Sequence, residues 1–184
     1  MTILHGDDRV YNNIMVQHYP VQHPEKTAES HEHERVGTAP FDIFPSYEEW
    51  IAHFKMGQEP DMHELAPYHF GHLPAWVGGN VYLNGATVSR HEHSGYQPEG
   101  RAEIALEERN GRMVLKTNIY DLIRDFRAGI ITTETLGKAF QPEQKFEHPD
   151  GTPIIFNSDY FGAHRGADAL PGPFAEGAEE MTVW

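Results

Sequence analysis

The sequence predicts a mainly β fold, an antiparallel β-sandwich or small barrel with a few peripheral helices. Three turn signals predict it: Asn84-Gly85, Asn110-Gly111 and His148-Pro149-Asp150-Gly151. An Asn-Gly pair suits the type I′ turn that joins two antiparallel strands, and Pro followed by Gly suits a tight turn. Hairpins joined in series form a sandwich or barrel rather than a parallel α/β sheet.

Each turn signal separates two short apolar runs. The runs are 81–83 and 86–88 around the first turn, 102–108 and 113–117 around the second, and Phe146 and 154–156 around the third. Short apolar runs bounded by turn residues are typical of strands. The sequence therefore predicts three hairpins from residue 81 onwards.

Helical patterns are few. Ser46 and Glu49 form a capping box, and Gly57 and Pro60 mark the end of the helix that it begins. The apolar stripe of this helix is Tyr47, Trp50, Ile51 and Phe54. This spacing places Trp50 in the core.

Two shorter helices are predicted between the second and third hairpins. The first has Asn118 as its cap and Gly129 as its end, and the second runs over 133–140. The apolar stripe of the first is Ile119, Leu122, Ile123 and Phe126. The pair has no basic cluster, so it does not predict a DNA-binding unit.

Composition excludes several classes of protein. The chain has 184 residues, no cysteine, and 28 acidic against 14 basic residues, a formal charge of -14. Disulfides and thiolate metal sites are therefore excluded, and nucleic acid and anionic membranes are disfavoured as partners. No apolar run is long enough for a membrane span and no signal peptide is evident, so we expect a cytoplasmic protein.

Three parts are expected along the chain. Residues 1–45 form an irregular arm rich in Pro and His, residues 46–162 form the β domain with its helices, and residues 163–184 form a Pro/Gly-rich tail. The tail ends in Val183-Trp184 and carries further apolar residues. It is expected either to dock on another chain or to fold back on its own domain.

His91, His93 and Glu99 are the candidate metal ligands. On a strand, residues two apart share a face, so His91 and His93 would present their imidazoles side by side. Glu99 is the nearest unpaired carboxylate that could complete an iron, zinc, copper or nickel site. The alternative is that both histidines lie on a solvated strand end.

The spacing of these residues resembles the first metal-binding motif of the cupin superfamily, in which the Glu follows sooner. The second cupin motif, in which Pro-x-Gly, His and Asn occur together and supply the last ligand, is not found in the sequence.

Trp76 is the candidate substrate-pocket residue. It lies between Pro74 and Gly78-Gly79, outside any helical or alternating pattern. Aromatic residues placed by rigid flanks often line ligand pockets or interfaces. The alternative is a tryptophan that closes the core at a sheet edge.

The organisation of the chain resembles the small subunit of two-subunit hydroquinone 1,2-dioxygenases, non-haem iron(II) enzymes that cleave para-diphenol rings. The likeness covers most of residues 40–175. It rests on the length, the cysteine-free acidic composition, residues 74–79 and residues 157–162 before the tail. None of these features is a specific motif by itself.

The resemblance implies a cupin-like chain that works with a larger cupin-like catalytic subunit. That partner would hold the Fe(II), and Trp76 would line the pocket for a small aromatic substrate at the interface. Two alternatives remain open. One is a self-contained metal-dependent cupin enzyme that uses His91 and His93, and the other is a non-catalytic assembly subunit.

Overall fold

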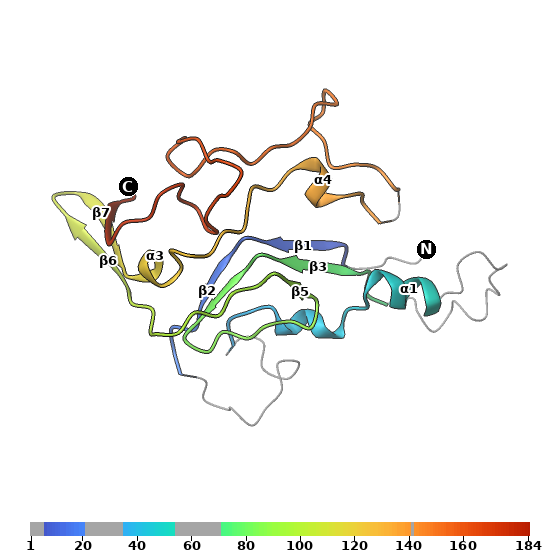
Figure 1. Cartoon of the computed structure of the whole chain (residues 1–184), viewed down its shortest axis with the longest axis horizontal. Helices are drawn as coiled ribbons and strands as arrows, with labels where there is room; N and C mark the ends of the chain where they lie inside the picture. Colours follow the sequence, from blue (N-terminus) through green and yellow to red (C-terminus); the bar gives the residue numbers. More distant parts are fainter. Residues whose placement is uncertain (1–5, 21–34, 54–70, 141) are drawn as a thin grey trace.

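The computed structural model describes residues 6–20, 35–53, 71–140 and 142–184 (Figure 1). Its strands are β1 (Asp8–Tyr11), β2 (Ile14–Val16), β3 (Ala75–Gly78), β4 (Val81–Leu83), β5 (Glu92–His93), β6 (Ile104–Arg109), β7 (Arg112–Thr117) and β8 (Glu180–Thr182). Its helices are η2 (Ala39–Ile43), α1 (Tyr47–His53), α3 (Ile119–Leu122) and α4 (Thr133–Leu136). The prediction of a mainly β chain with few short helices is confirmed.

Two of the three sheets are parallel. Strand β1 pairs with β3, β3 pairs with β5 on its other side, and β2 pairs with β4. Three segments of the chain therefore stack on one another in parallel, each aligned with the equivalent part of its neighbour. We call them coil 1 (residues 8–16), coil 2 (residues 75–83) and coil 3 (residues 92–96). Such stacking is the arrangement of a parallel β-helix. It differs from the antiparallel hairpins that the turn signals predict for residues 81–88.

Coils 1 and 2 also repeat in sequence. Val10 lies beside Val77 and Ile14 beside Val81 at one constant offset, and each coil has an Asn just before its second strand. In each coil one residue between the two strand segments has a left-handed backbone: Asn12 (φ 57°), Gly79 (φ 66°) and Ser94 (φ 60°). The same bend therefore recurs from coil to coil, which keeps the coils in register.

A buried polar network connects the stacked bends. Asn80 is fully buried, and its Oδ1 accepts hydrogen bonds from Asn13 N at 2.9 Å and Asn13 Nδ2 at 3.0 Å. Asn80 Nδ2 donates to Glu92 at 2.8 Å, and Glu92 also accepts from the Tyr82 hydroxyl. Thr38 hydrogen bonds the same hydroxyl at 2.7 Å. These partners satisfy polar groups that would otherwise be costly to bury.

The apolar core lies between coil 2 and α3. Its buried members are Val81, Leu83, Ala102, Ile119 and Ile123. Trp50, predicted to be core, is buried and contacts the Phe140 ring edge-on at 4.6 Å.

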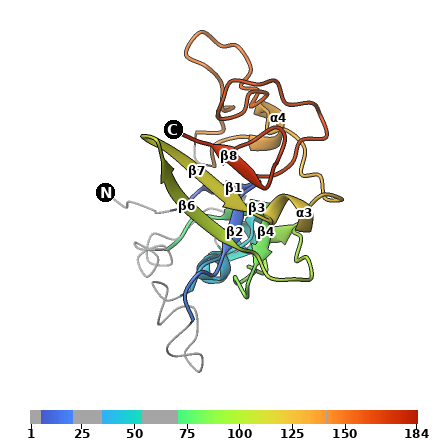
Figure 2. The same ribbon diagram turned by 90° about the vertical axis from the view of Figure 1, so that its left-hand side faces the viewer.

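The third sheet is antiparallel and lies beside the stack (Figure 2). Its β6–β7 hairpin turns at Asn110 (φ 52°) and Gly111 (φ 74°), which confirms the predicted turn. Residues 84 and 85 also adopt left-handed conformations, but β4 pairs with β2 instead of with 86–88. The turn near His148 is confirmed as a short antiparallel bridge between Glu147 and Pro153.

The capping box of α1 is confirmed. Glu49 N donates to Ser46 Oγ at 3.1 Å, and Ser46 N donates to Glu49 Oε2 at 2.7 Å. The expected end of this helix at Gly57 and Pro60, with Phe54, lies outside the described residues.

Helices α3 and α4 are single turns, shorter than predicted. Asn118 is at the N-cap position of α3 as predicted, but its side chain makes no cap hydrogen bond and instead bridges Glu103 N and Arg101 O. Gly137 (φ 71°) ends α4 after four residues.

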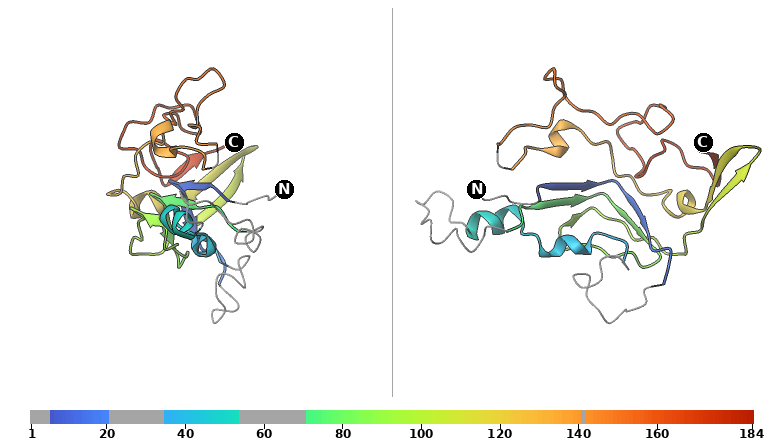
Figure 3. Two further views of the ribbon diagram at one scale, coloured as in Figure 1. Left: turned by 90° about the vertical axis from the view of Figure 1, so that its right-hand side faces the viewer. Right: turned by 180° about the vertical axis from the view of Figure 1, so that it is seen from behind.

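Residues 128–173, which we call the cap segment, lie along the β1 side of the stack (Figures 1 and 3). Gly172 N donates to Asn12 O at 2.7 Å, and Asn12 Nδ2 donates to Gly129 O at 2.7 Å. End caps of this kind cover the last coil of solenoid folds.

The structure corrects the expected N-terminal arm and shows which of the two alternatives holds for the tail. Strands β1 and β2 belong to the stack, so residues 8–16 are not an irregular arm. The tail at 163–184 folds back on this chain, where β8 pairs with β7. None of the helices in the described ranges has the length and apolar character needed to cross a lipid bilayer.

Candidate functional site

Trp76 lies on β3, half buried, against an arginine. The Arg9 guanidinium carbon is 4.1 Å from the centre of the Trp76 ring and 4.5 Å from that of Phe146. Arg9 therefore occupies a position between coil 2 and the cap segment where cation–π attraction holds both rings. The structure assigns Trp76 a packing contact, and its predicted place in a substrate pocket stays a prediction.

The structure does not bring His91, His93 and Glu99 together. His91 is buried and its Nε2 lies 2.8 Å from Phe44 O, whereas His93 and Glu99 are exposed. The carboxylate beside the histidines is Glu92, which is held by Asn80 and Tyr82. No three His, Cys, Asp or Glu side chains of the described ranges form a metal-binding group.

A groove of about 650 Å³ lies between coil 1 and the cap segment. Coil 1 contributes Arg9, Tyr11, Asn12, Asn13 and Ile14. The cap segment contributes Gly129, Ile130, Ile131, Leu136, Phe156, Ser158, Arg165, Gly172 and Pro173. Small-molecule sites in proteins have volumes of roughly 300–1,000 Å³.

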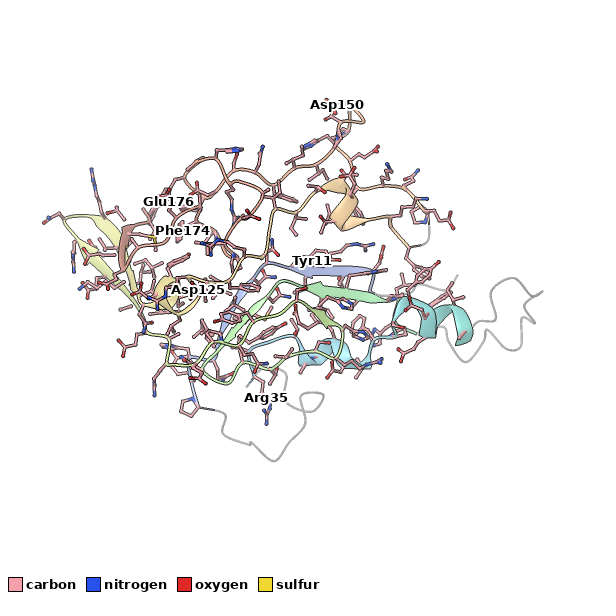
Figure 4. The ribbon with its side chains drawn as sticks, in the orientation of Figure 1. Tyr11, Arg35, Asp125, Asp150, Phe174 and Glu176 are labelled. Atoms are coloured by element: carbon pink, nitrogen blue, oxygen red, sulfur yellow. The ribbon has the colours of Figure 1, made fainter. Side chains whose placement is uncertain are left out.

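Strand pairing fixes one wall of this groove. Strands β1 and β2 are at the edges of their sheets, so half of their backbone polar groups face away from β3 and β4. Figure 4 shows Tyr11 on β1, the strand nearest to the cap segment. The Tyr11 ring packs on the backbone of Gly78, where an added Cβ would lie 3.3 Å from the ring.

Arg9 connects the two walls of the groove, because it lies on coil 1 and hydrogen bonds the backbone of the cap segment. Its Nε donates to Leu136 O at 2.9 Å, its Nη2 donates to Lys138 O at 2.6 Å, and its Nη1 pairs with Asp7. Only 8% of the Arg9 side chain is exposed, and four of its five N–H donors are bonded within the fold. A site with walls fixed in this way is preorganised for a ligand.

Several polar groups of the groove have no protein partner among the described residues. They are the hydroxyls of Tyr11 and Ser158, the Oδ1 of Asn13, and the Nε and Nη1 of Arg165. Burial raises the pKa of Tyr11, more than nearby Arg9 lowers it, so this hydroxyl stays protonated and can both donate and accept. The unpaired groups face a wall of isoleucine, leucine and phenylalanine side chains.

The described residues that line the groove include no Asp, Glu, His or Lys. Its titratable side chains are those of Tyr11, Arg9 and Arg165.

Local sequence patterns do not indicate the groove residues. The repeated Val-x-x-Asn pattern at 10–13 and 77–80 is the signal that could have found them, because it predicts two stacked coils. Nothing local in residues 129–173 indicates that they cover coil 1.

Comparison with known proteins supports the fold. No protein-family model matches the chain, and no curated protein matches it. A solved structure described as the complex structure of XylC with xylose is similar, with a TM-score of 0.73 and 23% sequence identity. The match covers 97% of this chain and 26% of that chain, so this chain spans about a quarter of the solved chain's length.

Proposed function

We propose that this chain binds a carbohydrate of about one sugar ring in the groove between coil 1 and the cap segment. The observation that carries this proposal is the lining, which combines unpaired hydroxyl, amide and guanidinium groups with apolar walls. A sugar presents hydroxyl groups around a ring with apolar faces, so it requires both kinds of contact. Ligand sites commonly combine an apolar lining with a few polar groups that fix orientation.

The similar solved structure supplies the first probe. XylC is described with bound xylose, and xylose is small enough for a groove of about 650 Å³.

Calorimetric titration of the full chain with D-xylose tests the proposal. A pentose has about ten non-hydrogen atoms, and a modest gain of about 0.3 kcal/mol per atom gives a Kd in the millimolar range. Tyr11→Phe removes the unpaired hydroxyl and should weaken binding severalfold. Tyr19→Phe is the matched control, because Tyr19 is 74% exposed and does not line the groove.

The proposal fails if neither xylose nor other monosaccharides bind, or if Tyr11→Phe and Tyr19→Phe bind equally well. Backbone NMR shifts upon titration should then be absent from residues 9–14 and 129–131.

The hydroquinone dioxygenase resemblance remains a second hypothesis, in which this chain is the small subunit. The rigid placement of Trp76 by Arg9 is the feature that favours it, because a pocket wall needs a fixed ring. Co-expression with a larger cupin-like subunit, followed by iron analysis and hydroquinone turnover, tests it. A complex without iron or turnover would contradict it.

A further inference from the structure

We propose that the groove selects a sugar that carries a carboxylate, a uronic acid, and that Arg165 binds this carboxylate. The inference rests on the proposed function and adds the substrate class. It depends on two observations, the charge of the lining and the hydrogen bonding of Arg165.

The groove lacks the acidic residues that dominate this chain. The sequence has 28 Asp and Glu against 14 Lys and Arg, yet the described lining contains two arginines and no carboxylate. A concave site lined by one sign of charge concentrates ligands of the opposite sign. The groove is therefore a locally positive site on an acidic protein.

The two arginines differ in what they bind. Arg9 is paired with Asp7 and donates to three backbone carbonyl groups, so four of its five N–H donors are engaged within the fold and its charge is neutralised. Arg165 donates one hydrogen bond, from Nη2 to Leu170 O. Its Nε is buried without a partner, and it forms no ion pair with a described residue. Arg165 thus keeps guanidinium donors that the described residues do not occupy.

The backbone holds Arg165 in position. Arg165 N donates to Asn157 O at 2.8 Å, and Ser158 and His164 form an antiparallel bridge beside it. Such anchoring fixes the origin of the side chain, which lowers the entropy lost when the guanidinium binds a planar carboxylate.

Asp159, a carboxylate that interacts with Arg165, is already engaged by the backbone. Asp159 accepts backbone hydrogen bonds from Ala175 at 3.0 Å, Phe161 at 2.9 Å and Ala163 at 2.8 Å. These bonds, the one from Ala175 foremost, hold the pKa of Asp159 below its usual range, and Arg165 contributes further. The Arg165 guanidinium therefore already stabilises the ionised form of one nearby carboxylate, that of Asp159.

The test compares D-glucuronate with D-glucose, a pair that differs only at the C6 carboxylate. Calorimetric titration of the full chain at pH 7 and low salt should show at least about tenfold tighter binding of glucuronate, since a charge-assisted hydrogen bond contributes about that much. Arg165→Gln should bring the two affinities within about threefold. Arg165→Lys should retain part of the preference. Arg124→Gln is the matched control, because Arg124 is 76% exposed and does not line the groove.

The outcomes separate this inference from the proposed function. Equal wild-type affinities for the two sugars, or a preference that survives Arg165→Gln, would overturn the inference and leave carbohydrate binding standing. Absence of binding for both sugars would overturn both. If Arg165→Gln does not fold, the salt dependence of the wild type decides, because a charge-based preference must fall as NaCl is raised to 1 M.

Discussion

Asn80 accepts two hydrogen bonds from Asn13, one from its backbone N at 2.9 Å and one from its Nδ2 at 3.0 Å. The two residues occupy equivalent positions in coils 1 and 2, next to the recurring left-handed bend. This contact joins the coils at the point where no strand ladder runs. It also positions the bend that forms part of the groove.

Asn80→Ala should lower the free energy of unfolding by about 2–4 kcal/mol, because the buried amide satisfies partners on both neighbouring coils. Asn13→Ala should cost less, because Asn13 is exposed and water can replace its amide. Urea denaturation of both variants measures the difference. Equal losses would contradict the role of Asn80 as the central member of the network.

Gly79→Ala should be more destabilising than Gly111→Ala. Both glycines have positive φ, 66° and 74°, so both substitutions carry backbone strain of about 1 kcal/mol. A Cβ at Gly79 would in addition lie 2.5 Å from Asn12 Oδ1, whereas nothing lies within 4 Å of one at Gly111. Comparison of the two urea midpoints isolates the steric contribution, and identical midpoints would refute the close approach of coils 1 and 2.

Arg9→Lys should destabilise the protein by about 1–3 kcal/mol, because lysine cannot reproduce the fork of donors or the stacking on Trp76 and Phe146. The change should also loosen the cap segment, seen as faster hydrogen exchange of residues 136–139. Arg124→Lys serves as the control, since that side chain is 76% exposed. Unchanged exchange in Arg9→Lys would show that other contacts hold the cap segment.

Trp76→Ala separates the packing role from the substrate-pocket role. If the Trp76 ring acts by packing against Arg9, Trp76→Ala should lose about 2–4 kcal/mol of stability, and its folded fraction should still bind sugar. Trp76→Phe should restore part of the stability. If the dioxygenase hypothesis holds, hydroquinone turnover of the assembled enzyme should fall more than tenfold at temperatures where Trp76→Ala stays folded.

Glu49 should make the stability of the protein sensitive to acid. Hydrogen bonds from Arg90, and then from Ser46 N, lower the pKa of Glu49 from 4.5 to about 2. A group whose pKa falls on folding stabilises the fold above its unfolded pKa, so this contribution is complete above pH 4.5 and is lost as the pH falls towards 2. Glu49→Gln should reduce this acid dependence, whereas Glu48→Gln on the same helix should not. NMR titration of the Glu49 carboxyl group checks the pKa directly.

Local patterns predicted the features that depend on neighbouring residues. The Ser46 and Glu49 capping box and the Asn110-Gly111 hairpin are confirmed, because caps and tight turns are set by a few adjacent φ/ψ angles and side chains. The mainly β class followed from the same signals. These parts of the structure need no distant partner.

Tertiary structure decided the pairing and the groove. Strands of two to four residues have too few side chains to show a period, so the sequence around Asn84-Gly85 could not say whether β4 pairs with 86–88 or with β2. The groove needs Tyr11 and Arg165 on opposite walls, although they lie far apart along the chain. Backbone pairing of coil 1 with coil 2, and the hydrogen bonds that hold the cap segment on Asn12, bring them together. The sequence determined the bends, and long-range hydrogen bonding decided which segments the bends place side by side.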